Sequence, residues 1–127
     1  MTQNKRQKAE AAGRWAERYA CLILALKGYK ILATRQKLSS GELDIICLKG
    51  GLVVIIEVKK RARLNDAKDA VSMKNWVRIG RAADLWLSRH GDLYNADRRY
   101  DLFAIATSLT FCHIRDAWRP DFPLTHG

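Results

Sequence analysis

Two long segments of the chain repeat apolar residues at the three- to four-residue spacing of an amphipathic helix. The first covers residues 4–27 and is followed by Gly28, a residue suited to ending a helix. Its expected buried stripe is Ala9, Ala12, Ala16, Tyr19, Ile23 and Leu26. The second covers residues 70–90, and its expected stripe is Val71, Val77, Ala82, Leu85 and Trp86. We therefore predict two long helices.

Shorter apolar runs bounded by turn-forming and polar residues predict strands. The expected strands cover residues 29–35, 42–49, 52–60, 98–107 and 110–118, with a turn at 38–41 and polar loops at 62–69 and 91–97. A helix between the third and fourth strands favours a parallel crossover connection. The pattern predicts an α/β protein with a mixed sheet flanked by helices.

Length and composition favour one folded domain over residues 1–127. The hydrophobic fraction of 48% is that of a globular protein, and residues 119–127, which contain Pro120 and Pro123, are expected to be a loose tail. The longest apolar stretch near the N-terminus, residues 19–26, is too short to cross a bilayer, which needs about 20 residues. No membrane span or secretory signal is predicted.

The net charge and the cysteine content indicate which class of partner the protein binds and in which compartment it is found. The chain has 23 Lys and Arg residues against 13 Asp and Glu residues, a formal net charge of +10. Such a charge attracts polyanions, of which nucleic acid is the commonest and an anionic membrane surface the rival. The three cysteines, Cys21, Cys47 and Cys112, lack the spacing of a zinc site, which favours a reducing cytoplasm.

Two acids interrupt the apolar runs of the predicted hairpin over residues 42–60. If Gly50 and Gly51 form a two-residue turn, the register places Asp44 opposite Glu57 on one face of the hairpin. Like charges placed opposite each other are destabilising, and burying a carboxylate costs free energy unless a partner compensates it. A β-bulge between the strands would break this register.

A divalent cation would remove that penalty. Mg²⁺ binds one or two protein carboxylates together with waters and substrate phosphate oxygens, and Mn²⁺ is the alternative ion. Lys59 follows Glu57 on the same face of the strand and can contact a scissile phosphate or activate a water. The pattern therefore favours metal-assisted phosphodiester hydrolysis. The alternative is that each acid is an edge residue paired with Lys59, Arg61 or a helix cation.

The string Gly41-Glu42-Leu43-Asp44, followed by Glu57-Val58-Lys59, resembles the D…E-x-K signature of the PD-(D/E)XK nuclease superfamily. From about Ala9 to Trp118 the chain resembles the bacterial YraN-like family, relatives of archaeal Holliday junction resolvases.

This resemblance implies a restriction-endonuclease-like αβββαβ core. It also implies that Asp44 and Glu57 bind the metal, that Lys59 is catalytic, and that Glu17 in the first helix completes the acidic cluster. Apart from the resemblance, Glu17 could equally contact Cys21 and pair with Arg14.

Cations expected to bind nucleic acid lie on several elements. They are Arg35, Lys37, Arg61, Lys74 and Arg78. On the second helix, Lys74 and Arg81 share a face with Arg78 nearby, and this face either contacts phosphate or is solvated. Lys60 and Arg63 are expected to be solvated at a strand end.

Several other side chains have expected structural roles. The tryptophans are expected in the core, with Trp76 the one to test for exposure. His113 is expected to be an ordinary strand residue. Asp101 is expected to pair with Arg98 or Arg99.

The leading interpretation is a cytoplasmic, Mg²⁺-dependent endonuclease-like protein that acts on structured, branched or damaged DNA. The alternative is a non-catalytic nucleic-acid-binding or DNA-repair accessory protein with a vestigial nuclease site. An RNA-associated factor is a more distant alternative. A homodimer would suit a resolvase-like role, because a DNA junction has symmetry-related strands.

Overall fold

The computed structural model describes residues 2–120, and side chains from residue 11 onward. Its elements are α1 (Thr2–Leu26), β1 (Lys30–Leu38), β2 (Gly41–Lys49), β3 (Leu52–Arg61), α2 (Leu64–Lys68), α3 (Met73–Ser88), β4 (Arg98–Ala106) and β5 (Phe111–Trp118). The predicted order of long elements is confirmed. The short helix α2 was missed, because the segment predicted as a polar loop carries no apolar periodicity.

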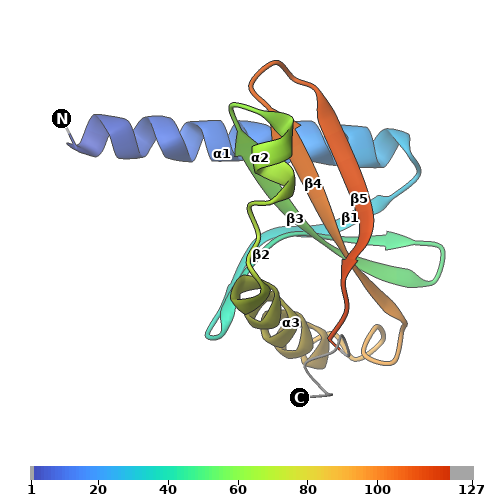
Figure 1. Cartoon of the computed structure of the whole chain (residues 1–127). Helices are drawn as coiled ribbons and strands as arrows, with labels where there is room; N and C mark the ends of the chain where they lie inside the picture. Colours follow the sequence, from blue (N-terminus) through green and yellow to red (C-terminus); the bar gives the residue numbers. More distant parts are fainter. Residues whose placement is uncertain (1, 121–127) are drawn as a thin grey trace.

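The strands form one sheet in the order β1-β2-β3-β4-β5 (Figure 1). Strands β3 and β4 are parallel, as predicted from the helical connection between them, and the other neighbouring pairs are antiparallel. The predicted α/β class with a mixed sheet is confirmed, and the arrangement is consistent with a restriction-endonuclease-like core. Most of the predicted tail, residues 121–127, lies outside the described residues.

Local hydrogen bonds fix the C-terminal end of α1 and the N-terminal end of α3. Gly28, with φ of 91°, follows α1, and the amide of Tyr29 donates to the carbonyl of Leu24 at 3.0 Å. This bond and the left-handed glycine complete a helix end of the Schellman type. Helix α3 begins after Ser72, whose Oγ accepts from the amide of Asn75 at 3.1 Å.

The two long helices cover opposite faces of the sheet. On one face, α1 packs through its small residues Ala16 and Ala20 and through Leu24 against Ile45, Val54, Ile56 and Phe103. On the other face, α3 packs its tryptophans against a second apolar cluster that contains Ile46, Ile55 and Tyr100.

The buried stripe of α1 differs from the predicted one. It lies one position later than Tyr19 and Ile23, because alanines let the helix approach the strands closely. This shift leaves Glu17 at the boundary of the buried stripe, directly after Ala16.

The tryptophans divide three to one. Trp76, Trp86 and Trp118 are 6%, 5% and 4% exposed, so their predicted core position is confirmed, also for Trp76, the residue singled out for a test of exposure. Trp15 is 42% exposed, and the prediction of a core position was wrong for this residue.

Within the described residues, no helix is both long and apolar enough to span a bilayer.

Candidate active site

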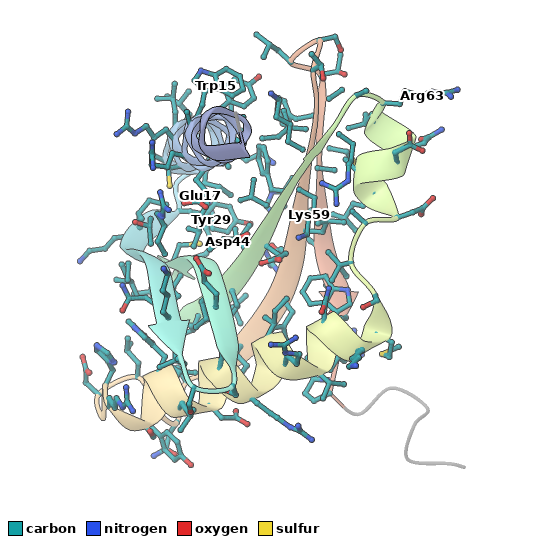
Figure 2. All side chains as sticks on the ribbon, turned by 90° about the vertical axis from the view of Figure 1, so that its left-hand side faces the viewer. Trp15, Glu17, Tyr29, Asp44, Lys59 and Arg63 are labelled. Atoms are coloured by element: carbon teal, nitrogen blue, oxygen red, sulfur yellow. The ribbon has the colours of Figure 1, made fainter. Side chains whose placement is uncertain are left out.

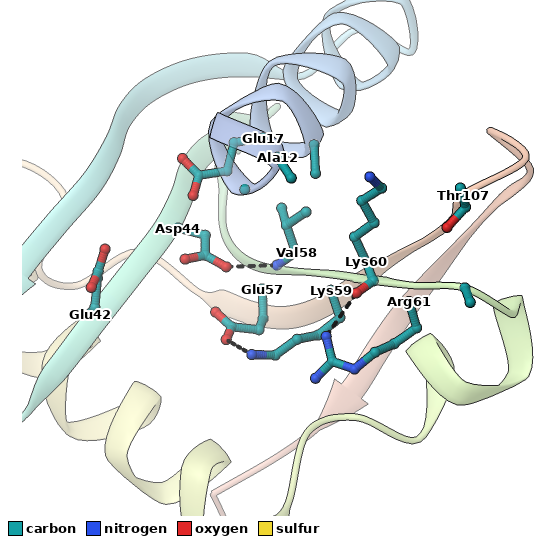
Figure 3. Close-up of a pocket in the computed structure, with 13 residues that line it drawn as sticks. Ala12, Glu17, Glu42, Asp44, Glu57, Val58, Lys59, Lys60, Arg61 and Thr107 are labelled. Carbon is teal, nitrogen blue, oxygen red and sulfur yellow. Dashed lines mark hydrogen bonds and ion pairs between the residues drawn. The ribbon is translucent and has the colours of Figure 1, made fainter. Parts of the chain in front are cut away.

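A pocket of about 640 Å³ opens between α1 and the ends of β2 and β3 (Figure 3). Four carboxylates line this pocket, which we call the acid cleft, and they are those of Glu17, Glu42, Asp44 and Glu57. Lys59, Lys60 and Arg61 line the same pocket. The structure thus brings together the predicted metal ligands Glu17, Asp44 and Glu57 and the predicted catalytic Lys59 in one pocket.

The cleft opens where β2 and β3 part. The predicted register is confirmed from the turn to the pair Ile45 and Ile56, the last residues paired in this ladder. One step further, Asp44 Oδ2 accepts a hydrogen bond of 2.8 Å from the amide of Val58. The Asp44 side chain therefore takes the place of a backbone acceptor at the point where the strands separate. This bond also fixes the orientation of the Asp44 carboxylate.

The direction of Asp44 depends on a break in the alternation of β2. Leu43 packs in the cluster under α3, whereas Ile45, two residues on, packs in the cluster under α1. Regular alternation would place both residues on the same face. The strand therefore changes face at Asp44.

The neighbouring strand β1 has a matching irregularity. The pairs that flank Arg35 are Thr34 with Ile45 and Gln36 with Leu43, so Arg35 lies beside Asp44 in the sheet. Arg35 has φ of 53°, a left-handed conformation unusual for a residue with a side chain. Left-handed and other strained residues concentrate at functional sites. The sequence alone gave no signal of this feature, since neither position is a glycine.

Glu57 is a poorly compensated carboxylate in this cleft. Its side chain is 12% exposed, and Oε2 lies 3.5 Å from Lys59 Nζ. Burial, followed by the charge of Asp44, raises the pKa of Glu57 to about 9, although Lys59 opposes the rise. Metal-free protein at neutral pH therefore keeps this group largely protonated.

Glu17 has a similar but weaker shift. Burial first, and then the charge of Asp44, raise the pKa of Glu17 to about 7 against the opposing charge of Arg35. Arg35 Nε lies 3.8 Å from Glu17 Oε1, so the ion-pair partner comes from β1 and not from the Arg14 of the predicted alternative. Figure 2 shows Glu17 on the side of α1 that faces Asp44.

The donor set fits a hard divalent cation. In the described part of the chain, no three carboxylate, imidazole or thiol groups are gathered into a ready-made metal site. Mg²⁺, however, takes only one or two protein carboxylates and keeps several waters. Asp44 and Glu57 supply such oxygens, and Glu17 supplies a further one. Burial is the main cause of the raised pKa values of both glutamates, and the negative charge of Asp44 is the next; a cation would neutralise that charge.

The predicted nucleic-acid-binding cations are all exposed, but they differ in position. Arg61 lines the acid cleft, Arg78 lines a smaller pocket with Glu42 and Glu57, and Arg35 lines a third pocket with Glu17. The other two cations, Lys37 and Lys74, line none of these three pockets.

Sequence reasoning missed Glu42 and Lys60 as cleft residues. Lys60 was expected in solvent at a strand end, yet it lines the acid cleft. The signal was available, because strand alternation places Lys60 on the same face as Val58 and Ile56, under α1.

Comparison with known proteins gives a consistent family. The profile of the uncharacterised protein family UPF0102 matches residues 16–105. A UPF0102 protein of Agrobacterium fabrum is 47% identical over 115 residues, which cover 91% of this chain and 94% of the relative. A UPF0102 protein of Maricaulis maris is 40% identical over 120 residues, which cover 94% of both chains. A third, of Chelativorans sp., is 44% identical over 113 residues, covering 89% of this chain and 91% of the relative.

Proposed function

Because the chain belongs to the uncharacterised protein family UPF0102, whose name assigns no chemistry, we propose a function from the geometry of the acid cleft. The proposed activity is metal-dependent hydrolysis of phosphodiester bonds in DNA, with structured, branched or damaged DNA as the substrate. The family is the YraN-like one that the sequence resembles, so that prediction is confirmed. The likeness of Asp44 and Glu57-Val58-Lys59 to the PD-(D/E)XK signature supports this chemistry.

One observation carries the proposal: Glu17, Asp44, Glu57 and Lys59 converge where two strands separate beneath a helix, in an open pocket. A fully paired ion cluster would serve stability and would need no opening. These acids are instead imperfectly compensated and accessible, which is typical of a functional site.

Each cleft residue has a proposed role. Mg²⁺ held by Asp44 and Glu57, with Glu17 in support, would supply positive charge to the phosphate and lower the pKa of a bound water. The amide of Val58 holds the Asp44 carboxylate in place. Lys59, whose ammonium lies 3.5 Å from Glu57, orients the attacking water and places a cation beside the scissile phosphate.

Binding and chemistry are divided between different residues. The chain has a formal net charge of +10, and its exposed cations attract the DNA backbone along several elements. Arg61 lines the acid cleft, and Arg78 and Arg35 line pockets that share an acidic residue with it, so we assign to these three cations the phosphates nearest the cut. Lys37 and Lys74 are assigned to more distant phosphates.

Location and assembly extend the proposal. Cys21, Cys47 and Cys112 are all free thiols, which suits a reducing cytoplasm. A homodimer would present two acid clefts to the two symmetry-related strands of a DNA junction. Analytical ultracentrifugation with and without a four-way junction tests this assembly, and a monomer on the junction would argue against it.

The test of the function is a nuclease assay on four-way junctions, flaps, and linear duplex and single-stranded DNA, each with Mg²⁺ or Mn²⁺. Wild type should cut at least one branched substrate, and Glu57→Gln should lose the activity. Asp92→Asn, which removes an exposed acid outside the cleft, is the matched control and should cut like wild type. Binding without cutting under every condition would favour the accessory protein, and preference for RNA would favour the RNA-associated factor.

A further inference from the structure

An exposed tryptophan, Trp15, and a partly buried tyrosine, Tyr19, form an aromatic pair on α1. The rings of Trp15 and Tyr19 are stacked with their centroids 5.4 Å apart and an angle of 4° between their planes. Resting on the proposed function, we propose that this pair is a stacking platform for an unpaired nucleobase of the bound strand. The substrate class is then DNA with an unpaired segment next to the cut.

The position of Trp15 distinguishes it from the structural tryptophans. It is 42% exposed, whereas the other three tryptophans are at most 6% exposed and pack in the cluster under α3. Leaving a large ring in water forgoes the stabilisation that burial would give. A ring that a bound base covers regains that stabilisation in the complex.

Contacts of Tyr19 with the turn between β4 and β5 and with β5 hold the platform in place. Tyr19 Oη donates a hydrogen bond of 3.1 Å to the carbonyl of Leu109, in the turn between β4 and β5. The Tyr19 ring also meets Phe111 edge-on, with centroids 6.1 Å apart and an angle of 81°. Trp15 therefore stacks on a ring that is fixed to the sheet, and a fixed ring loses little conformational entropy when a base binds.

Lys60 joins the platform to the acid cleft. Its Nζ lies over the Trp15 ring, 5.5 Å from the centroid, and the same residue lines the cleft. Its flexible side chain can leave the ring for a phosphate while a base takes its place. A cation beside an aromatic face is the combination that binds single-stranded nucleic acid, through phosphate contacts and base stacking.

The geometry also places the base relative to the cut. Figure 2 shows Trp15 on the side of α1 turned away from Asp44, whereas Glu17 is on the facing side. Trp15 and Glu17 thus lie on different sides of α1. The platform suits a neighbouring nucleotide and not the one that carries the scissile phosphate.

The experiment measures binding alone. Fluorescence anisotropy compares labelled oligo(dT) with an abasic oligomer of the same length and charge, in Ca²⁺. The variants are Trp15→Leu, which keeps an apolar side chain, and Trp15→Phe, which keeps a ring. Leu22→Ala, at an apolar residue of α1 that is 58% exposed and does not line the cleft, is the matched control.

Wild type should bind oligo(dT) about fivefold or more tightly than the abasic oligomer, because stacking contributes at least this much per base. Trp15→Leu should bind the two equally, Trp15→Phe should retain part of the preference, and Leu22→Ala should retain all of it. The inference is overturned if Trp15→Leu keeps the preference, if Leu22→Ala loses it, or if wild type has none.

The nuclease proposal and the stacking-platform proposal can be contradicted independently of each other. Wild type that prefers bases through Trp15 but cuts no substrate supports the platform and contradicts the nuclease. Wild type that cuts DNA while Trp15→Leu keeps its base preference supports the nuclease and contradicts the platform.

Discussion

The carboxylate of Asp101 on β4 and that of Glu57 on the neighbouring strand β3 have opposite environments. Asp101, in β4, is fully buried and accepts from Arg99, His113 and the amide of Asp116 at 2.7–2.9 Å. Burial opposes its ionisation, but the hydrogen bonds from His113 and Arg99 hold the pKa of Asp101 below its ordinary value. The hydrogen-bonding capacity of the Asp101 carboxylate is therefore used by donors of the protein itself.

The acid cleft is the opposite case. Glu57 lies near Asp44 and meets Lys59 at 3.5 Å, and its pKa is raised instead of lowered. Both regions contain strand acids and nearby cations, so residue type alone does not separate them. What separates them is the number of donors that reach each carboxylate. The cleft acids keep lone pairs that the proposed cation would use, and the fold loses some stability in leaving them without donors.

The largest expected effect is the loss of stability when Asp101 is replaced. Replacing Asp101 with Ala leaves the guanidinium of Arg99 and the ring of His113 without their shared acceptor in a buried setting. We expect the free energy of unfolding to fall by about 3–5 kcal/mol. Urea unfolding followed by circular dichroism measures this change. Asp84→Ala removes an ion-paired acid that is 70% exposed and should cost less than about 1 kcal/mol. Equal costs at both positions would refute the buried role.

The same group determines part of the acid sensitivity. The folded pKa of Asp101 is below its unfolded value of about 3.9, so its contribution is present above that pH and lost as the pH falls through the folded value. Stability of the wild type should therefore decline as the pH drops below about 4. Asp101→Asn should be less stable at neutral pH and should decline less steeply. Parallel declines in urea melts at several pH values would contradict this linkage.

In the acid cleft the expected loss is in chemistry instead of stability. Lys59→Ala should slow hydrolysis about a hundredfold, or about 3 kcal/mol, because a transition-state contact is removed. Affinity should change little, with the salt dependence of binding reduced by at most about one charge. Single-turnover cleavage and anisotropy separate the two effects. Lys68→Ala, an exposed lysine of α2, serves as the control with the same charge change. Lost binding with unchanged turnover would make Lys59 a docking cation.

The smallest effect is a gain of stability. In metal-free protein the folded pKa of Glu57 is about 9, above the ordinary 4.5, so the folded state binds the proton more tightly. Stability should therefore fall as the pH rises from about 4.5 to 9. Glu57→Gln removes this penalty and should raise the free energy of unfolding by about 0.5–2 kcal/mol at pH 8, with no gain at pH 4. A variant less stable than wild type at pH 8 would show that Glu57 is compensated.

Much of the fold follows from local patterns in the sequence. The glycines at 50 and 51 form the predicted turn, and the pairing of Lys49 with Leu52 fixes the register as far as Ile45 and Ile56. Hydrophobic alternation places the strands, and the helix between β3 and β4 makes them parallel. These features depend on neighbouring residues, so periodicity detects them.

Other features depend on contacts that periodicity does not detect. The face change at Asp44 accompanies a left-handed Arg35 on the next strand, and no glycine marks it. For Asp101, the predicted choice between Arg98 and Arg99 is resolved in favour of Arg99. His113, expected to be an ordinary strand residue, contacts the buried Asp101 through Nε2 at 2.8 Å and lies 2.9 Å from Lys27 Nζ through Nδ1. Lys27 and His113 are 86 positions apart in the sequence, so no local pattern links them.

The exposure of Trp15 was missed for a related reason. Periodicity predicted Tyr19 on the buried stripe. Ala16 and Ala20 are buried against the sheet instead, and the neighbouring Trp15 is left exposed. Side-chain size determined which face of α1 was buried.

The most direct test of the acid cleft is calorimetric titration of the metal-free protein with Mg²⁺ at pH 7, repeated in buffers of different ionisation enthalpy. Wild type should bind Mg²⁺ and release protons, because Glu57, with a pKa of about 9, must lose its proton to become a ligand. Asp92→Asn should behave like wild type, and Glu57→Gln should lose both the binding and the proton release. Absence of Mg²⁺ binding in wild type, or equal binding by Glu57→Gln, would contradict the assignment of this cleft as a metal site.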